Sequence, residues 1–271
     1  IGHPIGHSMS PFIHKRLFGL SGKYVEYSSA DIAPEDLESS IPRLSRLSGF
    51  NITIPHKEAM MKYLADTDDS AKRYGAVNCV KCENGRMSGC STDAYGFKKA
   101  LLGGGVRLLG NVLVLGCGGA ARTIAREAAD SGCTVTIAAR NRSLAKADAL
   151  AEWINSSGGK ALTAPMDDIK GSFDLLINAT PVGMYPNADA SPVGVELLSR
   201  CGALFDAIYN PGVTRLMGSA RSLGVKTVGG MPMLVWQAVA AHEFWYGASF
   251  DDRDIENLIS DAEKETKVIF G

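Results

Sequence analysis

The fold is decided by the stretch Val112-Leu113-Val114-Leu115-Gly116-Cys117-Gly118-Gly119-Ala120-Ala121. An apolar run leads into a glycine turn, and an alanine-rich helical pattern continues from the turn to about Ser131. A second apolar run then extends from Thr134 to Ala139. This order of strand, turn, helix and strand is the context that a G-x-G-x-x-G/A motif requires. It predicts a dinucleotide site, and a plain strand–turn–helix without a ligand is the alternative.

The residues of this turn have the properties that a diphosphate site needs. Gly116 permits a tight turn, and Gly118 has no β-carbon, so a pyrophosphate can approach its backbone. Ala121 is small enough for the helix to pack closely on the strand. The unpaired N–H groups at the start of the helix then favour an anion.

The end of the second strand indicates which dinucleotide is bound. NAD sites usually carry Asp or Glu at this point, where the carboxylate binds the ribose 2′-hydroxyl. Here Arg140 and Arg142 flank the same point. Because a guanidinium group binds phosphate at two points, the pattern favours the 2′-phosphate of NADP(H).

Length, composition and charge narrow the class of protein. At 271 residues the chain is long for one core, so two domains are expected. The net charge of −1 gives no indication of a nucleic-acid partner, and no apolar stretch reaches the roughly 18 residues of a membrane span. The chain starts at Ile1 without a signal-peptide pattern, so a cytoplasmic protein is expected. It lacks an initiator Met, and we expect a short piece with most of a first strand to precede Ile1.

Helical and strand patterns alternate along the chain, which predicts an α/β fold with a parallel sheet. Helices are expected over 10–20, 33–46, 57–64, 70–74, 92–102, 233–246 and 252–270. Besides the two strands above, strands are expected over 24–30, 49–54, 161–163, 175–178, 203–207 and 226–228. Glycines at 103–105 and 229–230 divide the chain into parts 1–100, 101–230 and 231–271.

The spacing Cys79-x-x-Cys82 is half of a zinc site, but the other half is absent, so no metal is expected. The segment 78–90 is better explained as a β-hairpin that turns at Asn84-Gly85. In that register Cys79 faces Cys90 across the pair. The two cysteines could form a disulfide or remain reduced thiols, and reduced thiols suit a cytosolic enzyme.

Several polar residues are candidates for chemistry, each with a structural alternative. Ser8 and Ser10 precede a helix, where they suit either helix capping or the binding of an anion. Lys57 follows a strand and opens a helix whose dipole disfavours its charge, so it is either a solvated surface lysine or a functional one. Asp93 suits a helix cap or a proton-handling pair with Lys57. Gln237 is a polar residue in a mostly apolar run.

Taken together, these segments resemble the shikimate dehydrogenases over nearly the whole chain. The resemblance rests on Pro4-Ile5-Gly6-His7-Ser8-Met9-Ser10-Pro11, Asn51-Ile52-Thr53-Ile54-Pro55-His56-Lys57, Gly75-Ala76-Val77-Asn78, Ser91-Thr92-Asp93, Gly116-Cys117-Gly118-Gly119-Ala120, Asn141-Arg142-Ser143, Asn178-Ala179-Thr180, Asp206-x-x-Tyr209-x-Pro211 and Met233-Leu234-Val235-x-Gln237. It implies a Rossmann-type NADP-binding domain and an α/β substrate domain completed by C-terminal helices. It also implies NADPH-dependent reduction of 3-dehydroshikimate to shikimate in aromatic amino-acid biosynthesis, by a monomer or homodimer.

The resemblance also implies roles for individual residues. Lys57 matches the catalytic lysine, paired with Asp93, and Ser8 and Ser10 match the serines that bind the substrate carboxylate. The ring hydroxyls and the substrate side of the site are matched by Thr53, Asn78, Asp93, Tyr209 and Gln237. The NADP site is matched by Gly116, Cys117, Gly118, Gly119, Ala120, Asn141, Arg142, Ser143, Lys146, Ala207 and Gly230, and less firmly by Asp69. Departures from the family pattern are Pro181 for a frequent Ser, Ser143 for Thr, and Lys15 for Asn.

Two other functions fit the same residues. A quinate/shikimate dehydrogenase that uses NAD differs only by small changes in the pocket, and Arg142 argues against NAD. A non-catalytic sensor domain on the same fold is the alternative from another class, and the intact Lys57 and Asp93 argue against it.

Overall fold

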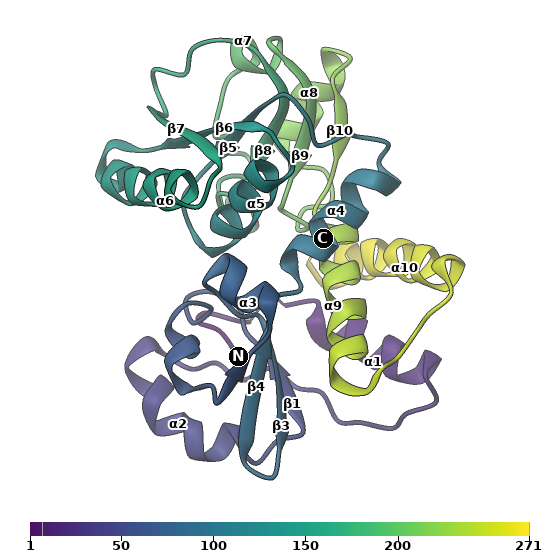
Figure 1. Ribbon diagram of the computed structural model, residues 1–271. Helices are drawn as coiled ribbons and strands as arrows, with labels where there is room; N and C mark the ends of the chain where they lie inside the picture. Colours follow the sequence, from purple (N-terminus) through teal and green to yellow (C-terminus); the bar gives the residue numbers. More distant parts are fainter. Residues whose placement is uncertain (7, 271) are drawn as a thin grey trace. The chain divides into compact units, whose positions relative to one another are not determined.

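The computed structural model describes residues 1–6 and 8–270 (Figure 1). The chain forms two compact units. Unit 1 consists of residues 1–96 and 234–262. Unit 2 consists of residues 97–233 and the described part of the C-terminal segment that starts at Glu263.

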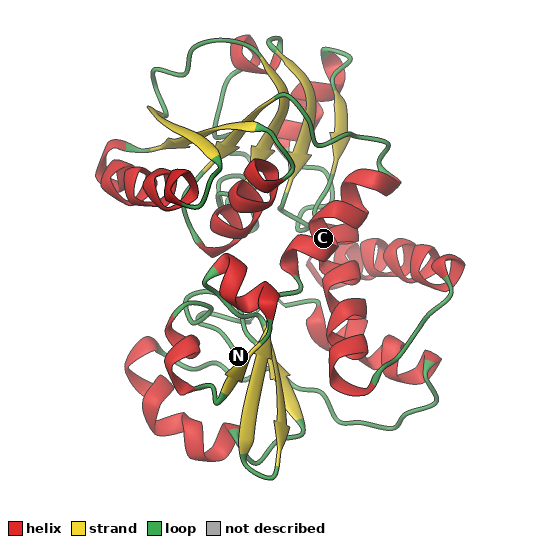
Figure 2. Cartoon of the chain, viewed as in Figure 1, coloured by secondary structure: helices red, strands yellow, loops and turns green. Residues whose placement is uncertain are grey.

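Unit 2 is built on a six-stranded sheet with the order β10-β9-β8-β5-β6-β7, in which every neighbouring pair is parallel (Figure 2). This confirms the predicted Rossmann-type α/β fold. The strands are β5 Asn111–Leu115, β6 Thr134–Ala139, β7 Lys160–Pro165, β8 Phe173–Asn178, β9 Cys201–Asp206 and β10 Lys226–Val228. The helices are α5 Gly119–Asp130, η3 Asn141–Ser143, α6 Leu144–Ser156, α7 Val195–Leu198 and α8 Arg215–Ser222, and most of α4 Asp93–Gly103.

Both faces of this sheet are buried. Val112 and Val114 of β5 belong to a core with residues of α5 and α6. Leu113 and Leu115 point to the opposite face, into a second core with residues of α7 and α8. Because successive side chains of a strand alternate between faces, a continuous apolar run is what a sheet covered on both sides requires.

Unit 1 contains a smaller mixed sheet with the order β1-β3-β4-β2, from β1 Gly49–Asn51, β2 Asp66–Thr67, β3 Cys79–Glu83 and β4 Arg86–Cys90. Its helices are α1 Ser10–Leu20, η1 Pro34–Asp36, α2 Leu37–Leu44, η2 Ala59–Tyr63 and α3 Asp69–Tyr74. Helices α9 Met231–Tyr246 and α10 Asp252–Phe270 follow the last strand of unit 2 in sequence. The part of the chain from 234 to 262 belongs to unit 1.

The hairpin of unit 1 has the predicted turn and register. Asn84 and Gly85 have φ values of 52° and 76°, which the tight turn requires. Cys79 lies directly opposite Cys90. All six cysteines are free thiols, so the two do not form a disulfide.

Three predicted elements differ from the structure. Residues 24–30 form no strand, and the Tyr24 side chain is fully exposed. The strand predicted over 49–54 ends at Asn51, because the chain turns before Pro55. The helix predicted to open at Lys57 is a short 3₁₀ helix that begins at Ala59, so the argument that a helix dipole disfavours the lysine charge was wrong.

Among residues 1–6 and 8–270, no helix combines the length and apolar character needed to span a bilayer.

Candidate active site

Lys57 and Asp93 form an ion pair in unit 1. Lys57 lies in the turn after β1, and Asp93 is the first residue of α4. The Lys57 Nζ donates to Asp93 Oδ2 over 2.5 Å, and the two side chains are only 13% and 7% exposed. Because little water screens them, their attraction is stronger than that of a surface pair. The lysine is therefore fixed in place at the surface of unit 1.

Asn78 connects this pair to a second helix. Its Nδ2 donates to Asp93 Oδ1 over 2.9 Å and to Gln237 Oε1 over 3.1 Å. Gln237 lies on α9, and its own Nε2 donates to the Leu234 carbonyl. Four of the predicted substrate residues, Lys57, Asn78, Asp93 and Gln237, are thus joined by one set of hydrogen bonds.

The sequence analysis missed Thr92 as a member of this cluster. Its backbone N–H donates to Asn78 Oδ1 over 2.7 Å, and its hydroxyl lies 2.9 Å from Asn78 Nδ2. These two contacts fix which end of the Asn78 amide faces Asp93. The available signal was the position of Thr92 next to Asp93 in the same motif.

Ser8, Ser10 and Thr53 lie in the same unit. Ser8 Oγ accepts the backbone N–H of Ser10 over 3.2 Å, and Ser10 is the first residue of α1. The N-cap of α1 is Met9, without a side-chain cap, so the capping role considered for Ser10 is wrong. Thr53 follows β1 and is exposed. Within the described residues, no hydrogen bond joins these three hydroxyls to the Lys57–Asp93 pair.

The glycine turn of unit 2 leaves room for a ligand at its backbone. Gly116 has a φ of 102°, and a β-carbon there would lie 3.1 Å from the Ala179 carbonyl oxygen. Apart from Gly118 itself and its two chain neighbours, no described residue has an atom within 4 Å of the place a β-carbon on Gly118 would take. Helix α5 begins at Gly119 with no side-chain cap, and Ala121 is fully buried against the sheet. These residues fit a bound diphosphate, whose oxygens would accept the free N–H groups of the first turn.

The basic segment after β6 meets the glycine turn. Arg140, Asn141 and Arg142 are exposed, and the 3₁₀ helix Asn141–Ser143 leads into α6. The Cys117 thiol contacts the Ser143 carbonyl at 3.7 Å. Burial raises the pKa of the Cys117 thiol. The positive charge of Lys146, which is also close to the turn, lowers the same pKa.

Two further predicted cofactor positions lie together at the end of β9. A β-carbon on Gly230 would overlap the Ala207 carbonyl, and the Gly230 N–H donates to the Ile208 carbonyl over 3.1 Å. Tyr209 follows in the same loop and is half-buried. Asp69 belongs instead to unit 1, at the start of α3, where its fully exposed carboxylate lies 3.9 Å from Lys72.

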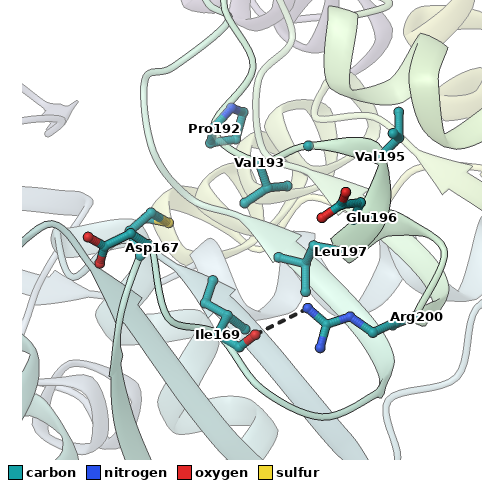
Figure 3. Close-up of a pocket in the computed structure, with 10 residues that line it drawn as sticks. Asp167, Ile169, Pro192, Val193, Val195, Glu196, Leu197 and Arg200 are labelled. Carbon is teal, nitrogen blue, oxygen red and sulfur yellow. Dashed lines mark hydrogen bonds between the residues drawn. The ribbon is translucent and has the colours of Figure 1, made fainter.

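A separate pocket of about 450 Å³ in unit 2 contains none of the predicted site residues (Figure 3). It lies between the loop after β7 and helix α7. The Arg200 guanidinium at its edge donates to the carbonyls of Ile169 and Gly171. The arginine is therefore engaged in holding the loop before β8.

Known proteins resemble the whole chain. Residues 1–80 match the family model described as the shikimate dehydrogenase substrate binding domain. The shikimate dehydrogenase (NADP(+)) of Methanocaldococcus jannaschii is 38% identical over 270 residues, which cover 96% of this chain and 95% of that protein.

Solved structures of related proteins are similar to this chain over nearly its whole length. The shikimate 5-dehydrogenase of Thermus thermophilus, in complex with NADP(H) and shikimate, is 36% identical and superposes with a TM-score of 0.86. The match covers 96% of this chain and 97% of the Thermus chain. The 5-ketofructose reductase of Gluconobacter sp. strain CHM43 is 31% identical with a TM-score of 0.80 and covers 96% of each chain. With relatives this similar over nearly its full length, the chain belongs to the shikimate dehydrogenase family.

Proposed function

We propose that this protein catalyses the reversible reduction of 3-dehydroshikimate to shikimate with NADPH, a step in the biosynthesis of aromatic amino acids. The observation that carries this proposal is the Lys57–Asp93 pair, held by Asn78 and Gln237 in a chain of this family. A sensor domain without catalysis has no need for a lysine fixed beside a carboxylate in this way.

The chemistry assigns a task to each member of the pair. Reduction of a ketone adds a hydride to carbon and a proton to oxygen, and NADPH supplies the hydride when bound. The Lys57 ammonium stabilises the alkoxide that develops on the C3 oxygen and gives it a proton. The neutral amine then regains a proton from water. Asp93 orients the ammonium and balances its charge.

The other residues of unit 1 hold the substrate in this proposal. Ser8 and Ser10 bind its carboxylate, and Thr53, Asn78, Asp93 and Gln237 bind its ring hydroxyls. Tyr209 is a further contact of the substrate. In this proposal the substrate domain is unit 1, which consists of residues 1–96 and 234–262.

Unit 2 binds the cofactor in the same proposal. The diphosphate lies on Gly116, Cys117, Gly118, Gly119 and Ala120. Asn141, Arg142, Ser143 and Lys146 surround the 2′-phosphate, and the backbones of Ala207 and Gly230 contact the rest of NADP. Asp69 is a further contact of the cofactor. The support is the open space at Gly118 and the exposed arginine beside the turn.

The test is an absorbance assay of the reduced cofactor, NADPH or NADH, formed in the four combinations of NADP or NAD with shikimate or quinate. We expect turnover with NADP and shikimate to exceed every other combination. Higher activity with NAD or with quinate would favour the relaxed enzyme instead. Because a 5-ketofructose reductase has the same fold, fold alone does not set the substrate, and a fifth arm follows the consumption of NADPH with 5-ketofructose.

The proposal also covers the cellular compartment and the oligomeric state of the enzyme. Six buried free thiols suit a reducing compartment, and we place the enzyme in the cytoplasm. We expect a monomer or a homodimer, which light scattering on a sizing column distinguishes.

A further inference from the structure

A buried polar network lies at the carboxyl ends of two neighbouring strands of unit 2. Asn178 is the last residue of β8, Asp206 is the last residue of β9, and they are direct partners in the parallel register. The Asn178 Nδ2 donates to Asp206 Oδ1 over 3.0 Å. Both side chains are completely buried.

Asn178 holds the loop that follows β8. Its Oδ1 accepts the Thr180 hydroxyl over 2.7 Å and the Thr180 N–H over 3.1 Å. The Thr180 Oγ1 in turn accepts the Val182 N–H over 3.2 Å. The path of residues 179–182 is therefore fixed by one amide side chain.

Asp206 holds the loop that follows β9. Its Oδ1 accepts the Ile208 N–H over 3.1 Å, and its Oδ2 accepts the Thr214 hydroxyl over 2.6 Å. Thr214 also caps α8 by accepting the Met217 N–H. Both ends of the loop from Ala207 to Thr214 are thus tied to one carboxylate.

The charge of Asp206 is balanced by dipoles alone. Asp206 forms no ion pair within the described residues, and all three of its partners are hydrogen-bond donors. A buried carboxylate without a cation is costly, and these donors offset part of that cost. A simple strand end needs no such group, which argues for a task in the loops.

The two loops carry or contact positions that the proposed function assigns to the cofactor. Ala179 and Thr180 lie against Gly116 at the diphosphate turn. Ala207 lies against Gly230, and its N–H donates to the Asn178 carbonyl. The network is thus the common support of three strand ends, β5, β8 and β9 (Figure 1).

We propose that Asp206 is a positioning residue for NADP(H): through Asn178, Thr180 and Thr214 it holds the loops after β8 and β9 in the form that binds the cofactor. This inference rests on the proposed function, because it takes Gly116, Ala207 and Gly230 as contacts of the cofactor. Asp206 itself need not touch the cofactor.

The test compares Thr214→Val, Thr214→Ser and Asp206→Asn with the unsubstituted enzyme. NADP affinity is measured directly by titration calorimetry without substrate, together with the melting temperature and the KM for shikimate. Thr214→Val removes the donor to Asp206, whereas Thr214→Ser keeps it. We expect Thr214→Val to weaken NADP binding about tenfold or more, and Thr214→Ser to restore most of that loss.

Asp174→Asn is the matched control. Asp174 lies near the opposite end of β8, where its carboxylate accepts the Asn111 N–H of β5 over 2.7 Å. This variant should lower the melting temperature but leave NADP affinity within about twofold of the unsubstituted enzyme. The KM for shikimate should also stay unchanged in Asp174→Asn, because Asp174 lies near the start of β8, whereas the loop that carries Tyr209 follows the end of β9.

The outcomes separate this inference from the proposed function. If the unsubstituted enzyme does not bind NADP, the proposed function itself fails. If it binds NADP, and Thr214→Val and Asp206→Asn lower the melting temperature without changing the NADP affinity, the network is structural only and the inference is overturned. Should Asp206→Asn not fold, the comparison of Val with Ser at position 214 decides alone.

Discussion

Lys57 is a lysine that the surrounding residues hold still, which is unusual for a long charged side chain. We expect Lys57→Ala to lower kcat about 100-fold or more, because the alkoxide loses its charge partner and proton donor. The variant should fold and bind NADP normally. Steady-state kinetics and a melting curve check this. Lys81→Ala is the control, since Lys81 forms an ion pair with Glu83 on the hairpin. More than about a tenth of the normal turnover in Lys57→Ala would exclude Lys57 as the proton donor.

Arg142 lies in the 3₁₀ helix before α6 and is exposed, so a phosphate can reach its guanidinium group. We expect Arg142→Ala to raise the KM for NADP more than about tenfold, since a hydrogen bond to a charged group contributes roughly 1.5–3 kcal/mol. The KM for NAD should hardly change. Lys170→Ala, which removes another exposed cation of unit 2, should leave both values alone. Equal losses with NADP and NAD would show that Arg142 does not bind the 2′-phosphate.

Among single residues, the sequence indicated one pair of partners but not the hydrogen bonds around that pair. Lys57 and Asp93 were predictable as a pair because both belong to motifs of the family. Thr92 was not, because its role depends on Asn78, which only the folded hairpin brings next to it. The assignment of Asp206 likewise needed the register of β8 and β9.

At the scale of elements, helices α1 and α9 are joined by a buried row of hydrogen-bonded side chains. His14 Nδ1 lies 2.9 Å from His242 Nε2, and His242 Nδ1 lies 2.5 Å from the Tyr246 hydroxyl. Burial lowers the pKa of His242 to about 4. Burial also lowers the pKa of His14, and the charge of His242 lowers it further. Both imidazoles are therefore neutral in the folded protein at neutral pH.

The two buried histidines predict how the stability of the folded protein changes with pH. The unfolded histidines, with a pKa of about 6.5, bind protons more readily than the folded ones. Their contribution to stability is therefore complete above pH 6.5 and is lost as the pH falls towards about 4. Urea unfolding at several pH values measures the effect, and His242→Gln should flatten the curve. Phe18→Leu is the control, because Phe18 packs on the His242 ring but does not titrate, so it should lower stability equally at every pH.

Elements with strong periodicity were predictable, and short ones were not. The strand β6 and the helices α1 and α10 have the expected bounds, because their patterns are long or clearly bounded. Residues 24–30 contain the β-prone Tyr24, Val25 and Tyr27 but pair with no strand of the described chain, and a local pattern does not reveal whether a partner exists. The 3₁₀ helix at Ala59 is too short to have a period.

For the whole molecule, the division into two units makes a prediction about ligands. Hydrogen exchange should slow over 116–121 and 140–146 when NADP is added, because a ligand stabilises the part that binds it. Shikimate alone should instead slow exchange around Lys57, Asn78 and Gln237. Mass spectrometry of peptic fragments resolves the two regions. Protection by NADP mainly within residues 1–96 would contradict the assignment of unit 2 to the cofactor.

Unit 1 takes its residues from both ends of the chain, and this has a consequence for biosynthesis. Gln237 and His242, the partners of Asn78 and His14, come from the last fifth of the sequence. A ribosome therefore synthesises residues 97–230 of unit 2 before α9 emerges to join the earlier residues of unit 1. We expect nascent chains interrupted before α9 to be inactive, because they lack Gln237, a member of the hydrogen-bonded cluster around Lys57.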